Sequence, residues 1–244
     1  MPSPGLADWL SSSLGRQLLQ AEGEILRGLL DDVFGLELLQ LGSWGASRAL
    51  LSQARTRRQT VVAPASARAS GFEVDVLAEL SQLPIQTATI DAVLLPHTLE
   101  FEADPHAIVR EADRVLTGEG QLIVLGFRPM SLWGLRSAGS RQGYPQGLQQ
   151  MLSMGRVRDW LALLGYEVVL QKHYLYSRPW GTGTDQASPR RILRRGLFNP
   201  LPSAAWLLKA RKHVYRMTPL RHRFFRERRR VFGQMPEPVK RNPS

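Results

Sequence analysis

Two glycines, Gly42 and Gly45, follow the apolar run 37–41 and precede the stretch 47–55, which has the composition of a short helix. A strand, a glycine turn and a helix in this order let the backbone approach a ligand closely, because glycine has no side chain. The first N–H groups of the helix can in addition bind an anion. The glycines are not spaced as in the dinucleotide-binding fingerprint G-x-G-x-x-G. The turn is therefore either a ligand-binding turn of another kind or only a tight connection.

His97 is a second candidate for chemistry, because it comes directly after the apolar run 89–96. Ligands of open α/β sheets bind at the carboxyl ends of the strands. A neutral imidazole at that edge can accept a proton from a substrate near pH 7. His97 is thus a candidate catalytic base, with a purely structural role as the alternative.

The elements that must position these residues alternate along the chain. Apolar residues at helical spacing predict helices, and apolar or β-branched runs bounded by Gly and Pro predict strands. The alternation, with connections of this length, favours a mostly parallel sheet with helices on both faces. We expect helices at 14–34, 47–55, 104–116 and 157–164, and strands at 37–41, 59–64, 72–77, 89–96, 121–127 and 166–176.

Two later segments are less regular. Residues 128–150 contain four glycines and two prolines and predict a loop or lid. Phe127, Trp133 and Tyr144 in or beside it either line an apolar substrate pocket or are ordinary packing. Residues 204–214 are compatible with a basic helix or with an edge strand antiparallel to the preceding one, and 178–203 predict an irregular excursion.

Composition narrows the function classes. The chain has no cysteine, which excludes disulfides, thiolate metal sites and a cysteine nucleophile and fits a reducing compartment. No run of 18 uninterrupted apolar residues occurs, and the N-terminus lacks the basic region of a signal peptide. We therefore expect a cytoplasmic protein with no bound metal.

Positive charge is concentrated at the C-terminal end. Residues 1–177 carry 15 basic and 18 acidic side chains, whereas residues 178–244 carry 17 basic and 3 acidic ones. Such asymmetry predicts a folded body at 1–214, including the excursion, and a basic C-terminal tail at 215–244. The tail is a candidate for binding nucleic acid or an anionic membrane surface.

Residues 79–126 carry short motifs whose order and spacing resemble those of class I S-adenosylmethionine-dependent methyltransferases that act on quinones and other small molecules. The wider arrangement also resembles a group of uncharacterised bacterial proteins with a methyltransferase type 11-like domain. The residues that carry the resemblance are Glu79, Leu83-Pro84-Ile85, Ile90-Asp91, His97 to Phe101, Asp104-Pro105, Glu111, Arg114-Val115-Leu116 and Gly118 to Gly120.

The resemblance implies a Rossmann-like class I methyltransferase fold, with a mostly parallel seven-stranded sheet, and S-adenosylmethionine as cofactor. The family's glycine motif consists of an acid followed by three glycines. This chain has Gln40 in place of the acid and Gly42, Trp44 and Ala46 in place of the glycines, so only the first glycine is retained. A tryptophan at this place would crowd the cofactor site or cover it. The family's second acid falls near Ala63-Pro64, where neither side chain can accept a hydrogen bond.

Site residues follow from the same resemblance. The family counterpart of Glu79 accepts a hydrogen bond from the adenine amino group, although Glu79 could also be a solvated carboxylate. His97 would lie beside the methyl group. The cofactor contacts implied are Gln40, Gly42, Gly45, Glu79, Leu80 and Leu95.

The expected function is methyl transfer from S-adenosylmethionine to an unidentified small-molecule or lipid-like acceptor. The alternative is a catalytically inactive protein of the same fold that uses its basic tail to bind nucleic acid or an anionic membrane. Gln40, Trp44 and Ala63 favour the alternative, and Glu79 and His97 favour the enzyme.

Overall fold

The computed structural model describes residues 4–33, 35–45, 50–51, 54–70, 72–179 and 202–213. The expected helix 47–55 and the excursion fall largely outside these residues, and the basic tail falls entirely outside them. Contacts divide the chain into two units, Met1–Val214 and Tyr215–Ser244. The first unit contains every helix and strand described below.

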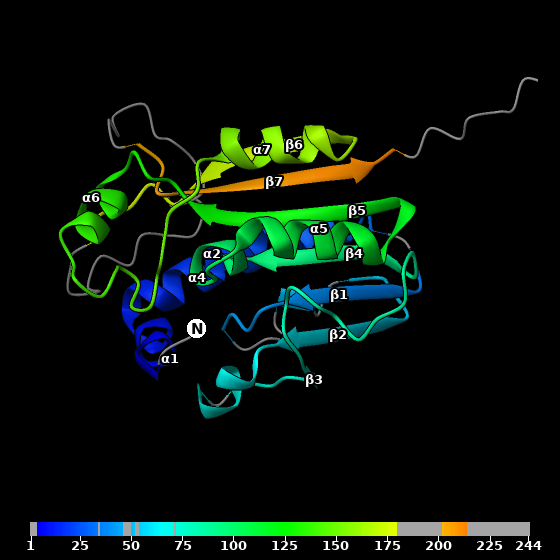
Figure 1. Cartoon of the computed structure of the whole chain (residues 1–244). Helices are drawn as coiled ribbons and strands as arrows, with labels where there is room; N and C mark the ends of the chain where they lie inside the picture. Colours follow the sequence, from blue (N-terminus) through cyan, green and yellow to red (C-terminus); the bar gives the residue numbers. More distant parts are fainter. Residues whose placement is uncertain are drawn as a thin grey trace, which may run out of the picture. The chain divides into compact units, whose positions relative to one another are not determined.

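A seven-stranded sheet with the order β3-β2-β1-β4-β5-β7-β6 forms the centre of the first unit (Figure 1). Neighbouring strands are parallel except that β7 is antiparallel to both β5 and β6. The α/β fold with a mostly parallel sheet is thereby confirmed. The strands are β1 Glu37–Leu41, β2 Arg58–Ala63, β3 Val76–Leu77, β4 Ile90–Pro96, β5 Leu116–Phe127, β6 Tyr166–Tyr174 and β7 Ala205–Lys212.

Helices cover both faces of the sheet, and each face has its own core. Successive strand residues point to opposite faces, so Leu38 packs in the core beneath α2 and Leu39 in the core beneath α5 and α7. Figure 1 shows α5 and α7 in front of the sheet and α2 behind it. The helices are α1 Pro4–Ser11, α2 Ser13–Leu30, α4 Thr98–Phe101, α5 Pro105–Val115, α6 Leu132–Ala138 and α7 Met154–Leu163, with a 3₁₀ helix η1 at Ala65–Ser70. No helix in this described part is long and apolar enough to cross a membrane.

Local signals explain the accurate predictions. Asp104 caps α5 by accepting from the Ala107 N–H at 3.0 Å, and Pro105 occupies the first turn, where its missing N–H costs nothing. The segment 128–150, expected to be a loop or lid, contains the helix α6. Three other expectations were wrong in extent. α2 ends at Leu30 rather than at residue 34. β5 begins at Leu116 rather than after Gly120, and β3 has two residues rather than six.

Of the two alternatives for 204–214, the structure shows the strand, β7, which is antiparallel to β6 as that alternative predicts but does not lie at the edge. β7 lies between β5 and β6, which makes β6 the edge. Its alternating Trp206, Leu208 and Ala210 pack on the α5 side, while Ala205 and Leu207 pack on the α2 side. Both faces are buried, which is the property of an inner strand and not of an edge.

We expect the position of β7 to decide where the chain can be truncated. A chain ending at Val214 should unfold cooperatively, because it keeps the whole sheet. A chain ending at Arg178 should show no cooperative transition, because β6 then loses β7, its one neighbour among the strands that the structure describes. Thermal unfolding followed by circular dichroism measures the difference, and equal midpoints for the two chains would contradict this assignment.

Candidate functional site

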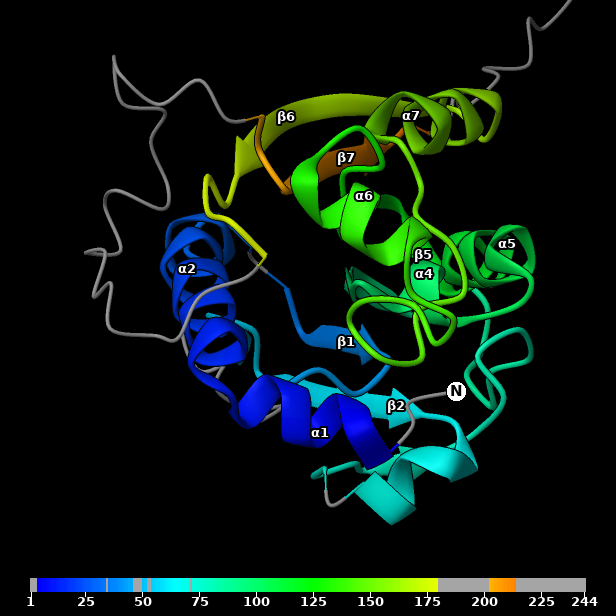
Figure 2. The same cartoon turned by 90° about the vertical axis from the view of Figure 1, so that its left-hand side faces the viewer.

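A small cavity lies where β1, β2 and β4 end, at the carboxyl edge of the sheet. Residues following these strands line it, together with Leu6 of α1, and its volume is about 20 Å³. That is close to the space needed by one water molecule. Figure 2 looks onto this edge and shows α1 lying across the ends of the strands. The lining residues are Leu6, Gly42, Ser43, Trp44, Pro64, Pro96, Thr98, Phe101 and Glu102.

Both glycines of the turn are required by its geometry. Gly42 has φ +88° and Gly45 has φ +64°, a region that favours glycine. A Cβ on Gly42 would lie 2.7 Å from Thr98 Oγ1, and one on Gly45 would lie 2.6 Å from Leu19 Cδ2. Gly42 therefore brings the backbone to the cavity wall, while Gly45 serves the packing of the turn against α2.

Two polar atoms of this turn are buried without a partner among the described residues. Gln40 donates from Nε2 to the Gly42 carbonyl at 3.0 Å, but its Oε1 accepts nothing. Ser43 Oγ, beside the cavity, is also buried and has no hydrogen-bond partner among the described residues. Buried polar groups without partners are rare and commonly mark the place of a water or a ligand.

Trp44 lines the cavity with a buried side chain. Its side chain is 1% exposed, and the indole N–H donates to Glu22 Oε2 at 2.7 Å. The ring lies 4.5 Å from the His97 ring and 5.8 Å from the Phe101 ring, measured between centroids. The indole thus fills space next to the cavity and is fixed there by a charged acceptor.

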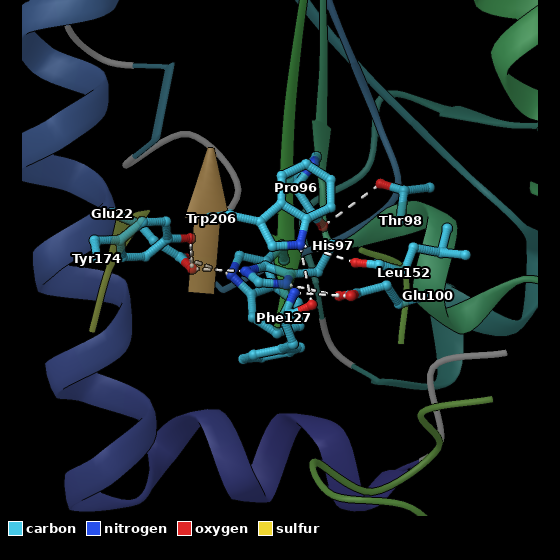
Figure 3. Close-up of polar contacts among 10 residues, drawn as sticks. Glu22, Pro96, His97, Thr98, Glu100, Phe127, Leu152, Tyr174 and Trp206 are labelled. Atoms are coloured by element: carbon cyan, nitrogen blue, oxygen red, sulfur yellow. Dashed lines mark hydrogen bonds and ion pairs between the residues drawn. The ribbon is translucent and has the colours of Figure 1, made fainter. Parts of the chain in front are cut away.

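The indole of Trp44 contacts a buried polar network of which Figure 3 shows Glu22, His97, Glu100 and Tyr174. His97 Nε2 lies 2.7 Å from Glu22 Oε1, and His97 Nδ1 lies 3.0 Å from Glu100 Oε2. The Tyr174 hydroxyl also donates to Glu22 Oε1, at 3.1 Å, and the Phe127 N–H donates to Glu100 Oε1 at 2.7 Å. The network therefore joins α2, the end of β4, α4, β5 and β6.

The electrostatics of this network keep His97 protonated. Burial alone lowers the pKa of His97, but the charge of Glu22 and the hydrogen bonds to Glu100 and Glu22 outweigh it and raise the pKa to about 9. Burial raises the pKa of Glu100, against the opposing effect of its hydrogen bond to His97. Near pH 7 the imidazolium is thus held between two carboxyl groups.

This geometry argues against the expected role of His97 as a base. The side chain is fully buried, and both ring nitrogens are engaged by glutamates, so neither is free to accept a proton from a substrate. The backbone at His97 has φ +57°, which the Leu125 carbonyl stabilises by accepting from the His97 N–H at 3.0 Å. The side chain holds elements together instead.

The other predicted residues divide into two groups. Glu79 is exposed, accepts from the Ser81 hydroxyl at 2.9 Å, and lies near Glu102, since its charge adds to burial in raising the pKa of Glu102. Glu102 lines the cavity, whereas Glu79 follows β3 at the same edge of the sheet and is not among the lining residues. Leu80 and Leu95 are buried in the core beneath α5 and α7, and neither lines the cavity.

A larger groove of about 590 Å³ lies in the predicted lid, between Pro129 and Met151. The three aromatic residues of that region do not line it. Phe127 and Trp133 are fully buried, and Tyr144 is 9% exposed. Trp133 and Tyr144 both pack edge-on against Trp9 of α1, which supports the packing alternative.

Sequence reasoning missed Glu22 and Glu100. Glu22 lies on the buried side of α2 four residues after Leu18 and four before Leu26. A carboxylate in the apolar stripe of an amphipathic helix must be paired, and this was the available signal. Glu100 follows His97 by three residues, a spacing that brings two side chains together on one helical turn.

Comparison with known proteins agrees with the fold. Residues 46–124 match the family described as "Methyltransferase domain", so the match begins just after the turn that carries Trp44. The uncharacterised protein YafS of Escherichia coli K12 is 34% identical over 150 residues, which are 61% of this chain and 59% of that protein. An uncharacterised protein of Mycobacterium bovis is 30% identical over 190 residues. The chain spans about three fifths of the length of these curated relatives.

Solved structures share the fold. A methyltransferase from Thermotoga maritima, described as S-adenosylmethionine-dependent and a possible histamine N-methyltransferase, aligns with a TM-score of 0.55 at 20% identity over 77% of this chain and 87% of that one. An S-adenosylmethionine-dependent methyltransferase from Mesorhizobium loti aligns with a TM-score of 0.54 at 18% identity over 79% and 98% of the two chains. The matching domain, the sheet order and these structures of the same fold support a relationship of the chain to the class I S-adenosylmethionine-dependent methyltransferases.

Proposed function

We propose that this protein binds S-adenosylmethionine at the carboxyl edge of β1, β2 and β4 and transfers its methyl group to a small-molecule acceptor. The observation that carries the proposal is the cavity at this edge, where Gly42, Thr98 and Glu102 converge from different elements. The family implies this cofactor. The alternative of an inactive binding module is not favoured, and the basic tail on which it depends lies outside the described residues.

The cofactor does not fit the cavity as it stands. Pockets for ligands of this size have volumes of about 300–1,000 Å³, and the cavity has about 20 Å³. Leu6 and Trp44 occupy its sides, and Pro64 stands where the family has its ribose-binding acid. We therefore derive no chemical step for the bound cofactor from this conformation.

The groove in the lid is our candidate for the acceptor site. It adjoins the cavity through α4, because the Glu100 carbonyl accepts from the N–H groups of both Gln149 and Gln150. Gln149 Nε2 donates to the Phe101 carbonyl at 2.9 Å. Phe101 lines the cavity, and both glutamines line the groove. Lining residues of the two spaces are therefore hydrogen-bonded neighbours, which supports assigning the groove to the acceptor.

The chemistry of the groove indicates the kind of acceptor. Backbone, amide and hydroxyl groups alternate along it with Leu148 and Met151, and Arg141 is the charged side chain among its lining residues. A small molecule with apolar surface and a few hydrogen-bonding groups suits such a lining.

We propose that the protein works in the cytoplasm, where the absence of cysteine is compatible with its folding.

Calorimetric titration with S-adenosylmethionine and S-adenosylhomocysteine tests the proposal. If Glu79 accepts a hydrogen bond from the ligand, we expect Glu79→Ala to weaken binding by about tenfold, the usual loss for one charged hydrogen bond. Glu119→Ala is the matched control, because Glu119 is an exposed carboxylate near the start of β5, at the opposite edge of the sheet. Absence of binding at millimolar ligand, both by the natural protein and by the Trp44 variants introduced below, would contradict the proposal.

A further inference from the structure

The cavity and the family's cofactor disagree in size, so some part of the wall must move before the ligand can enter. Part of the wall belongs to the end of β4 and to α4, which hydrogen bonds hold in place. Thr98 Oγ1, for example, donates to the Leu41 carbonyl at 2.5 Å and ties α4 to β1. The largest side chain on the connection after β1 is Trp44. Like Gly42 and Ser43, Trp44 stands outside any helix or strand, but it is the one of these three with a bulky side chain beside the cavity.

We infer that Trp44 is a movable gate of the cofactor site, held closed by its hydrogen bond to Glu22, and that S-adenosylmethionine binds only after the indole has left its place. This inference rests on the proposed function, since it assumes that the cavity is the cofactor site. In this inference the side chain of Trp44 sets the affinity of the site for S-adenosylmethionine.

The closed position is well defined. Glu22 is itself fixed, because His97 Nε2 and the Tyr174 hydroxyl both contact its Oε1, which leaves Oε2 as the acceptor of the indole N–H. The indole lies against the ring of His97, which is protonated near pH 7. A cation next to an aromatic face is attracted to it, so this contact also stabilises the closed position. Glu22 and His97, both charged, therefore stabilise the closed position of Trp44.

The same turn contains the features that allow opening. Gly42 and Gly45 flank Trp44, and both already occupy the left-handed region that other residues avoid. Gln40 Oε1 and Ser43 Oγ, on the N-terminal side of the indole, are buried without partners in the closed state. An open turn with a polar ligand beside it would give these atoms the partners that they lack, which offsets part of the loss of the Trp44 contacts.

The test compares Trp44→Phe with the natural protein by calorimetry with S-adenosylmethionine. Phenylalanine keeps an aromatic ring but cannot donate to Glu22, so the closed state is weakened and the competent fraction rises. We expect the affinity to increase by about tenfold, the effect of removing one hydrogen bond to a charged acceptor. Trp133→Phe is the matched control, because Trp133 is another buried indole with one hydrogen bond, to the Ser177 carbonyl, and does not line the cavity. Its affinity should equal that of the natural protein.

Tryptophan fluorescence gives a readout that does not depend on activity. Contact with a protonated histidine quenches indole emission, so displacement of Trp44 from His97 should raise the emission when S-adenosylmethionine binds. The rise should persist in Trp133→Phe and be absent from Trp44→Phe. A further variant, Trp44→Gly, removes the gate completely and should bind at least as tightly as Trp44→Phe if it folds.

The outcomes separate this inference from the proposed function. Tighter binding by Trp44→Phe, with loss of the emission change, supports the gate. Binding by the natural protein that is unchanged or weakened in Trp44→Phe overturns the gate and leaves the proposed function intact, because Trp44 is then an ordinary wall of the site. If neither the natural protein nor Trp44→Phe binds the ligand, both the gate and the proposed function are overturned.

Discussion

Replacing Glu22 by alanine is expected to lower the free energy of unfolding by about 3–5 kcal/mol, the usual cost of removing one partner of a buried ion pair. The carboxylate accepts from the Trp44 indole and the Tyr174 hydroxyl and faces the His97 imidazolium at 2.7 Å. All three would lose a partner at once, in a place that water does not reach. The loss exceeds that of an exposed salt bridge, for which solvent competes.

Glu24→Ala is the control for this substitution. Glu24 lies in the same helix two residues further on and is partly exposed. Because both substitutions replace Glu by Ala in this helix, the change in intrinsic helix propensity is the same in the two variants. Urea unfolding of both variants at pH 7 measures the difference. We expect Glu24→Ala to stay within about 0.5 kcal/mol of the natural protein, as surface substitutions commonly do. A similar small effect for Glu22→Ala would mean that the network does not contribute to stability.

The fold was predictable because it depends on patterns that repeat. The run "QLIVLGF" is buried on both faces in β5, and Asp104-Pro105 marks the start of α5 with a cap and a proline. β7 shows the limit of such patterns. Its apolar residues fit an edge or an inner strand equally well, and only β5 and β6 on its two sides, distant in sequence, decide between them.

The site was predictable only in part, for a comparable reason. Position in the sequence placed Gly42 and Trp44 at the carboxyl edge and Glu79 near it, because parallel strands end at one edge. The partners of His97 could not be found in that way. Glu22 lies 75 residues earlier in the chain, and its pairing with His97 depends on how α2 packs on β4. A charged or hydrogen-bonding partner shifts the pKa of a titratable residue and occupies its proton-accepting atom. The residue type alone therefore does not identify a catalytic base.

The second large effect expected is a loss of stability as the pH rises. His97 has a pKa of about 9 in the folded protein against 6.5 for an unperturbed histidine. Its folded-state pKa is raised, so its contribution is fully present below about pH 6.5 and is lost as the pH rises through about 9. The difference corresponds to about 3 kcal/mol, since one pKa unit equals 1.36 kcal/mol. A small part of this contribution is already lost at pH 7, so urea unfolding at pH 7 and pH 9.5 should show a loss of about 2 kcal/mol. Tyr174 does not titrate in this range because burial and Glu22 raise its pKa well above 10.

Two observations attribute this loss to His97. Nuclear magnetic resonance of the imidazole groups should show one histidine that remains protonated to about pH 9, and substituting His106, His173 and His213 in turn by glutamine identifies the others in the described part of the chain. Glu22→Gln keeps the shape of the side chain but removes its charge, which is the largest effect that raises the pKa of His97. In this variant we expect the histidine to titrate at lower pH and the loss of stability between pH 7 and 9.5 to shrink. If the resonance of His97 titrates near 6.5 in the natural protein, the imidazole is neutral at physiological pH, and its two nitrogens cannot both donate to glutamates as the geometry requires.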